Sequence, residues 1–135
     1  MSEKSIIKKN ITKTFLRTEE TMNKYKQRVD DIKNGKVKPF EDFEASTVKK
    51  FKHWLIVKNE FPYDAVSEVN HMLFTIRKIP FSWDYVNKDE MDELNELKKT
   101  YLNKEYDVIY ENLPKGQTVP GHFHIHLLKL KREEF

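Results

Sequence analysis

Three of the five histidines stand at alternate positions near the C-terminus, and this spacing is the first sign of chemistry. Successive side chains of a β-strand point to opposite faces, so a strand here places His122, His124 and His126 on one face. The intervening residues are apolar, so the other face can pack on a helix while the imidazoles line an open surface. A neutral imidazole is a competent nucleophile near pH 7. The pattern therefore suggests nucleophilic catalysis at phosphorus, with the flanking imidazoles donating hydrogen bonds to phosphate oxygens.

Two other interpretations of this strand remain open. The first is a polar strand face that carries three hydrated histidines. The second is a metal site, although His122 and His126 stand about 13 Å apart on a strand that rises about 3.3 Å per residue. Because metal–imidazole bonds are only about 2 Å long, all three rings cannot easily meet one ion. Two rings could do so with His71 or Asp64 as a third ligand.

The same stretch resembles the signature of the histidine triad (HIT) superfamily, His-φ-His-φ-His-φ-φ, where φ is apolar. The matching residues are His122-Phe-His124-Ile-His126-Leu-Leu, and the preceding Gly116-Gln-Thr-Val is similar to a segment that often comes before the signature. Trp54 to Asn59, Phe61-Pro-Tyr-Asp and His71-Met-Leu resemble the two earlier strands of that family. The resemblance covers roughly residues 51 to 128. It departs from the family at Pro120-Gly121, which adds a residue before the triad.

The resemblance implies a nucleotide hydrolase or nucleotidyltransferase that attacks an α-phosphorus through a covalent nucleotidyl-histidine. His124 would be the nucleophile, His122 would orient its ring, and His126 would bind phosphate and assist the leaving group. His71 would supply a fourth histidine. The residues that the family pattern implies for substrate binding are Asn59 at the ribose, Gln117 and Thr118 near the phosphates, and Asn112 as a further polar contact.

The substrates implied by the resemblance are purine nucleotides of two kinds, dinucleoside polyphosphates or nucleoside phosphoramidates. No cofactor and no protein-bound metal are expected, and a homodimer is possible. Two alternatives belong to other classes: a nucleotide-binding or adaptor protein with little turnover, and a metal-binding protein that uses triad histidines.

The periodicity of the chain predicts the elements that position these residues. Helices are expected over residues 18–33 and 87–104, where apolar residues recur at helical spacing behind the N-capping residues Thr18 and Asn87. Strands are expected over 51–58, 71–77, 106–110 and 122–131, and residues 36–50 are expected to be irregular. This order favours an α+β fold of the HIT-like type, with an antiparallel sheet of about five strands packed against a central helix.

Length and composition fit one small domain. The chain has 135 residues, which suggests an N-terminal helical extension over 1–50 packed on a catalytic domain over 51–135. Net charge is only +3, so no specific nucleic-acid partner is expected. The sequence contains no cysteine, which excludes disulfides and thiolate zinc sites. No apolar run approaches the length of a membrane span, so we expect no membrane association and a cytoplasmic location.

Overall fold

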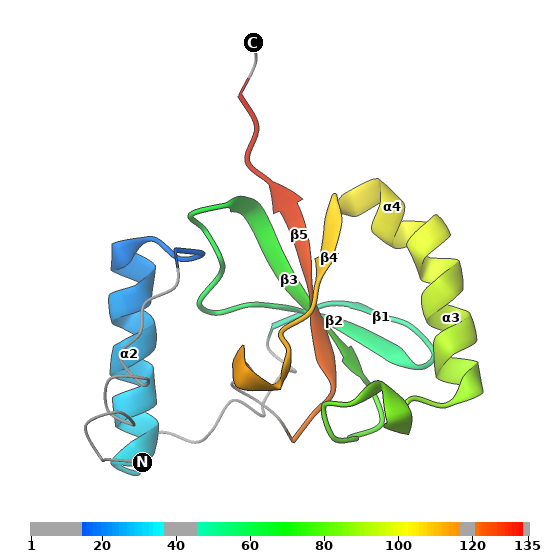
Figure 1. Cartoon of the computed structure of the whole chain (residues 1–135), viewed down its shortest axis with the longest axis horizontal. Coiled ribbons are helices and arrows are strands. Elements are labelled where there is room, and N and C mark those ends of the chain that lie inside the picture. Colours follow the sequence, from blue (N-terminus) through cyan, green and yellow to red (C-terminus); the bar gives the residue numbers. More distant parts are fainter. Residues whose placement is uncertain (1–14, 37–45, 117–120, 134–135) are drawn as a thin grey trace.

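The centre of the molecule is a five-stranded antiparallel sheet, seen in a computed structural model that describes residues 15–36, 46–116 and 121–133. The strand order is β1-β2-β3-β5-β4 (Figure 1). The strands are β1 (Thr47–Lys50), β2 (Trp54–Lys58), β3 (Ser67–Thr75), β4 (Val108–Tyr110) and β5 (His124–Leu130). The helices are α2 (Glu19–Lys33), α3 (Lys88–Lys99) and α4 (Tyr101–Glu105), with short 3₁₀ turns at Trp83–Tyr85 and Pro114–Gly116. The predicted α+β class with an antiparallel sheet is confirmed.

Helices α3 and α4 cover one face of the sheet and α2 lies on the other side (Figure 1). The core forms on the α3 side, where the apolar side chains of β5 pack with those of the helices. Its fully or almost fully buried members include Trp54, Phe123, Ile125, Leu127, Leu94, Leu97 and Leu102. The strand alternation predicted around the triad is therefore confirmed for its apolar face.

Helix α3 begins as its sequence predicts but ends earlier. Asn87 accepts a hydrogen bond from the Glu90 N–H, and the Glu90 carboxylate accepts one from the Asn87 N–H, which completes a capping box. The expected single helix over 87–104 is interrupted at Thr100, where the backbone leaves helical geometry. The Thr100 hydroxyl donates to the Glu96 carbonyl, so the side chain competes for a carbonyl group of the last turn of α3.

The sequence predicts an irregular segment over residues 36–50, but part of this segment is a strand. Thr47–Lys50 forms the edge strand β1, which pairs antiparallel with β2. Three of its four residues are exposed, so it lacks the buried apolar face by which strands are recognised in a sequence. The sheet consequently begins before residue 51, the expected start of the catalytic domain.

Helix α2 is joined to the rest of the molecule through the segment between β2 and β3. Asp64 accepts hydrogen bonds from the backbone N–H and hydroxyl of Thr18 and from the hydroxyl of Thr21. Arg28 pairs with Glu60. The carboxylate of Asp64 thus lies at the N-terminus of α2, where the helix dipole favours a negative charge.

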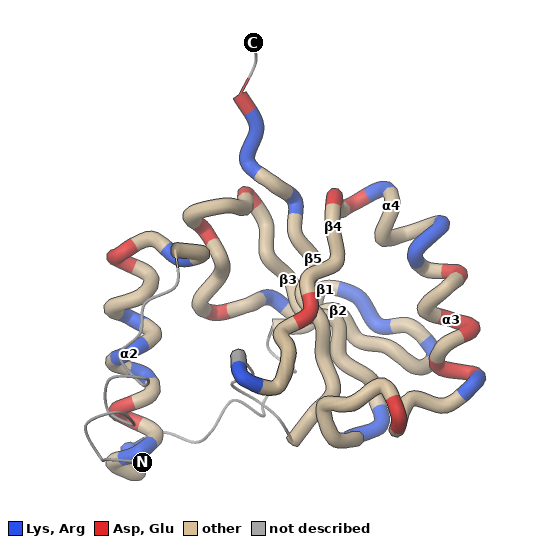
Figure 2. Tube along the Cα trace, in the orientation of Figure 1, with Lys and Arg blue, Asp and Glu red and all other residues tan. Residues whose placement is uncertain are grey.

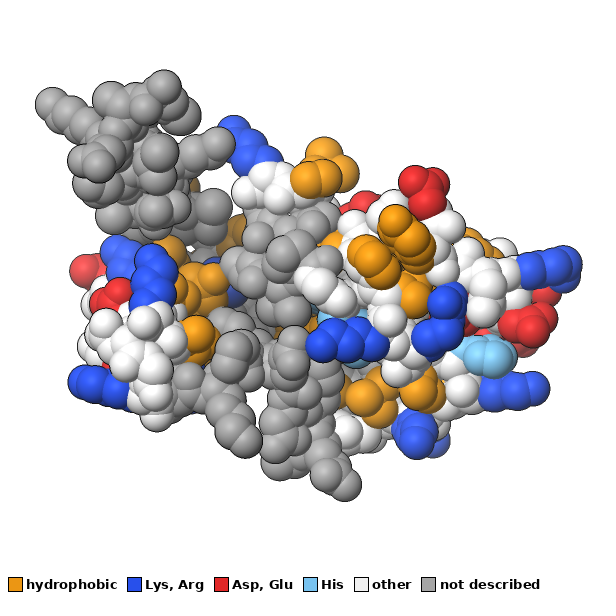
Figure 3. All heavy atoms as spheres, turned by 90° about the horizontal axis from the view of Figure 1, so that it is seen from below, with side chains coloured by type: hydrophobic (Ala, Val, Ile, Leu, Met, Phe, Trp, Pro, Cys, Tyr) orange, Lys and Arg blue, Asp and Glu red, His pale blue; other side chains and the backbone are white. Residues whose placement is uncertain are grey.

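Charged residues of both signs are interspersed along the helices (Figure 2). Lys24–Glu20 on α2 and Lys88–Asp92 on α3 are exposed ion pairs one helical turn apart. Seen from below, apolar side chains are exposed among lysine and arginine side chains (Figure 3). No helix in the described part of the chain has the length and apolar character needed to span a membrane.

Candidate active site

Strand pairing builds the site on the face of the sheet opposite α3. In the antiparallel register of β3 and β5, His124 lies opposite Phe74 and His126 lies opposite Met72. His122 precedes the first residue of β5. Opposed residues in an antiparallel pair project to the same face, so the rings of His124 and His126 meet the side chains of β3 on the α2 side. Their ring centroids are 5.6 Å apart.

The imidazole of His124 is held in one tautomer by its own strand. Its Nδ1 lies 3.0 Å from the carbonyl oxygen of His122, and because a carbonyl only accepts, Nδ1 carries the proton. In the neutral ring this leaves the lone pair on Nε2. Phe74 stacks on the ring at a centroid distance of 4.7 Å, and Phe81 meets it edge-on at the same distance. Burial lowers the pKa of His124, the hydrogen bond to the His122 carbonyl raises it, and the charge of His122 lowers it again; the net shift is downward, so the neutral form is favoured.

The ring of His126 is enclosed by polar and aromatic side chains from β3, β4 and the segment between β2 and β3. Its Nδ1 lies 3.2 Å from the amide nitrogen of Asn70, on β3. The Tyr63 ring stacks on it at 4.7 Å, with the phenol oxygen 3.4 Å from Nε2. Tyr110 of β4 packs edge-on at 6.0 Å. Burial lowers the pKa of His126 to about 3, with smaller effects from the charges of His124 and Arg17.

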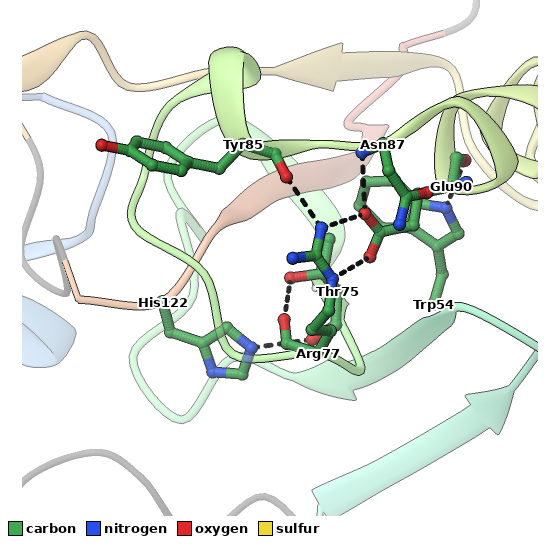
Figure 4. Close-up of polar contacts among 7 residues, drawn as sticks. All are labelled: Trp54, Thr75, Arg77, Tyr85, Asn87, Glu90 and His122. Atoms are coloured by element: carbon green, nitrogen blue, oxygen red, sulfur yellow. Dashed lines mark hydrogen bonds and ion pairs between the residues drawn. The ribbon is translucent and has the colours of Figure 1, made fainter.

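His122 is connected to the N-terminus of α3 through a chain of polar contacts (Figure 4). Its Nε2 donates to the Thr75 carbonyl at 2.7 Å, and the Thr75 hydroxyl donates to the Arg77 carbonyl at 2.7 Å. The Arg77 guanidinium donates to the carboxylate of Glu90, which is almost fully buried. The orientation of His122 is thereby tied to the connection between β3 and α3.

The sequence had indicated that the triad histidines line an open surface, but two of them, His124 and His126, are buried. His124 is only 2% exposed and His126 only 4% exposed. The aromatic rings of Phe74, Phe81 and Tyr63 account for this enclosure, because each contacts one of the two imidazoles directly.

His71 does not join the other three histidines. It lies opposite Lys58 on β2 and Leu127 on β5, so its side chain projects to the face covered by α3 and α4. There its Nδ1 is hydrogen-bonded to the Tyr106 hydroxyl at 2.7 Å. The assignment of His71 as a fourth site histidine is therefore corrected: alternation along β3 places it on the opposite face from His124 and His126.

Two of the other expected substrate-binding residues lie one contact away from His126. Asn59 donates to the amide oxygen of Asn70 at 2.9 Å, and Asn112 donates to the Tyr63 hydroxyl at 3.0 Å. Both amides thus support groups that touch His126. Gln117 and Thr118 lie outside the described residues.

The sequence did not single out Asn70, Phe74 or Tyr63 for this site. Asn70 and Phe74 lie two positions from Met72 on β3 and therefore on its face, and Met72 lies opposite His126. The sequence does not show which face of β3 meets the histidines, because apolar residues occur on both alternating sets of positions in His71–Arg77. Within the described part of the chain, no group of three or more His, Asp or Glu side chains could hold a metal ion.

Comparison with known proteins finds similarity only among solved structures. No family model and no curated protein matches the sequence. One similar structure is described as "Hit Like Protein": it is 16% identical, with 76% of this chain and 96% of that chain covered and a TM-score of 0.46. Another is a histidine triad protein from Clostridium difficile solved at 0.95 Å resolution. It is 18% identical, with 80% of this chain and 92% of that chain covered and a TM-score of 0.47. Both similarities are remote, so the case for this family rests on the chain's own histidine strand.

Proposed function

We propose that the chain is a histidine triad protein that hydrolyses or transfers a nucleotidyl group through a covalent intermediate on His124. The observation that carries this proposal is the hydrogen bond from His124 Nδ1 to the His122 carbonyl. It directs the lone pair to Nε2, and the lowered pKa keeps that nitrogen unprotonated near neutral pH. A neutral imidazole with a fixed tautomer meets the requirement for an activated nucleophile.

The substrate class is a dinucleoside polyphosphate or a nucleoside phosphoramidate. In the first step Nε2 of His124 forms a bond to the α-phosphorus, and the bond from phosphorus to the leaving group breaks with its electron pair on that group. Water then attacks the phosphorus, the N–P bond breaks, and the electron pair returns to Nε2 while the water proton passes to solvent. In a transferase, another acceptor takes the place of water. Hydrogen bonds from neighbouring imidazoles would stabilise charge on the phosphoryl oxygens.

A second candidate is a nucleotide-binding protein with little turnover. The burial of His124 at 2% exposure favours it, because an in-line attack needs open space beside Nε2. Phe81 and Phe74 occupy two sides of that ring. Turnover requires one of these contacts to open, whereas binding of a nucleotide beside the cluster does not.

The deciding experiment is a product assay. The full chain is incubated with diadenosine tetraphosphate and, separately, with adenosine 5′-phosphoramidate, and products are separated by chromatography with and without EDTA. We expect AMP release by the natural chain and by Lys129→Ala, an exposed position on the same strand. We expect none with His124→Ala. Full activity of His124→Ala would refute the mechanism, and binding without product from either substrate would establish the second candidate.

A further inference from the structure

The carboxamide of Asn70 lies beside His126 with all its hydrogen-bonding positions occupied. Its oxygen accepts from the Tyr63 N–H at 3.0 Å and from the Asn59 amide at 2.9 Å. Its nitrogen donates to the His71 carbonyl at 3.1 Å and faces His126 Nδ1 at 3.2 Å. An amide has two acceptor sites and two donor hydrogens, so no position is left over. The residue is only 4% exposed, so water cannot readily replace these partners.

Two backbone groups determine which way this amide points. The Tyr63 N–H can only donate, which places the Asn70 oxygen on that side. The His71 carbonyl can only accept, which places the Asn70 nitrogen on the other side. A flipped amide would turn its N–H toward the Tyr63 N–H, donor against donor, and its oxygen toward the His71 carbonyl, acceptor against acceptor. In a buried site this costs free energy, because the hydrogen bonds stay unmade. The group that faces His126 Nδ1 is therefore N–H, and Nδ1 must accept.

We infer that Asn70 is a positioning residue that fixes His126 as the neutral tautomer with its proton on Nε2. The functional consequence of this inference rests on the proposed function. His126 offers a hydrogen bond to an anionic oxygen but has no readily transferable proton. Loss of the Nε2 proton from a neutral imidazole would leave an imidazolate. His126 thus suits a leaving group that departs as an anion, as a polyphosphate chain does, better than an amine that must be protonated to depart.

The other groups that face His126 agree with a neutral ring. They are the phenols of Tyr63 and Tyr110, the imidazole of His124 and, from the segment before α2, the cation of Arg17. The Arg17 guanidinium lies 4.8 Å from the Tyr63 ring centroid. Burial raises the pKa of Tyr63, so its phenol stays uncharged at neutral pH. None of these four groups brings a negative charge that would stabilise an imidazolium.

The test is nuclear magnetic resonance of the full chain labelled with ¹⁵N at histidine. Long-range proton–nitrogen spectra report which ring nitrogen carries hydrogen, and His126 is assigned by its absence from His126→Gln. In the natural chain we expect a proton on Nε2 only, with no titration between pH 5 and pH 8. A proton on Nδ1 of the uncharged ring would overturn the inference. This arm requires no change at Asn70, so it decides the question even if variants at that position fail to fold.

The variant Asn70→Asp supplies the second arm. A carboxylate beside Nδ1 accepts from it and stabilises the imidazolium, so the titration midpoint of His126 should rise by about two pH units or more. The control Asn95→Asp, which adds the same charge at an exposed position of α3, should leave the midpoint in place. An unmoved midpoint in a folded Asn70→Asp chain would refute the role of Asn70.

A third arm compares rates on the two substrates. The ratio of kcat/KM for diadenosine tetraphosphate to that for adenosine 5′-phosphoramidate should fall in Asn70→Asp as the pH is lowered toward the raised midpoint of His126, because the imidazolium that then forms can protonate an amine. If the natural chain turns over neither substrate, the proposed function fails while the tautomer measurement still stands. If it turns over both and the tautomer is Nδ1–H, the function stands and this inference fails.

Discussion

The enclosure of His126 predicts a specific loss of stability in mild acid. Lowering the pH from 7 to 5 leaves the ring uncharged in the folded protein, because its pKa there is lowered to about 3. In the unfolded chain the same ring titrates near its ordinary value of about 6.5. The unfolded state therefore binds more protons than the folded state throughout this interval. By linkage, the free energy of unfolding falls as the pH falls below about 6.5.

The size of the effect follows from the width of the interval. Each pH unit below about 6.5 changes the free energy of unfolding by about 1.4 kcal/mol while the folded ring stays neutral. From about 6.5 down to pH 5, His126 alone lowers it by about 2 kcal/mol. His124 and His71, whose pKa values burial also lowers, add to the loss in the natural chain.

The assay is urea unfolding at pH 7 and pH 5, followed by tryptophan fluorescence, for the natural chain and for His126→Gln. Trp54 is fully buried and reports loss of the core. His124 and His71 are present in both chains, so their contributions cancel in the comparison. We expect the natural chain to lose about 2 kcal/mol more than the variant between the two pH values. Equal losses in the two chains would show that His126 is not kept neutral by its surroundings.

Two further predictions concern the elements that support the site. Asp64→Ala removes the acceptor for Thr18 and Thr21, so amide hydrogen exchange in α2 should accelerate about tenfold, the factor expected for a loss near 1.4 kcal/mol. Exchange in α3 should stay unchanged. Equal acceleration in both helices would contradict a local anchor. Asn87→Ala removes half of the capping box of α3 and should lower the free energy of unfolding in urea by about 1 kcal/mol, and no change would mean that this cap contributes nothing.

The elements with strong local signals were predictable from the sequence. The start of α3 follows from its capping residues, and the buried face of β5 follows from the alternation around His124. Strand β1 was missed because its residues are mostly exposed, and the interruption at Thr100 was missed because a single threonine in a helical pattern is an ambiguous signal.

Contacts that depend on strand register were not predictable. His71 and Asn70 are neighbours on β3, and alternation sends them to opposite faces. Because apolar residues occur at both parities of that strand, its sequence does not show which neighbour faces the triad. The pairing of β3 with β5 decides it, and this pairing joins residues fifty or more positions apart.

The segment between β2 and β3 has a double attachment. Its Asp64 and Glu60 hold α2, while Tyr63, between them, stacks on His126. An insertion or deletion in these few positions would move the helix anchor and the ring over the histidine together. We therefore expect natural variation in the length of this segment to be rare unless α2 changes with it. In protein engineering, this segment is a poor place to graft a loop.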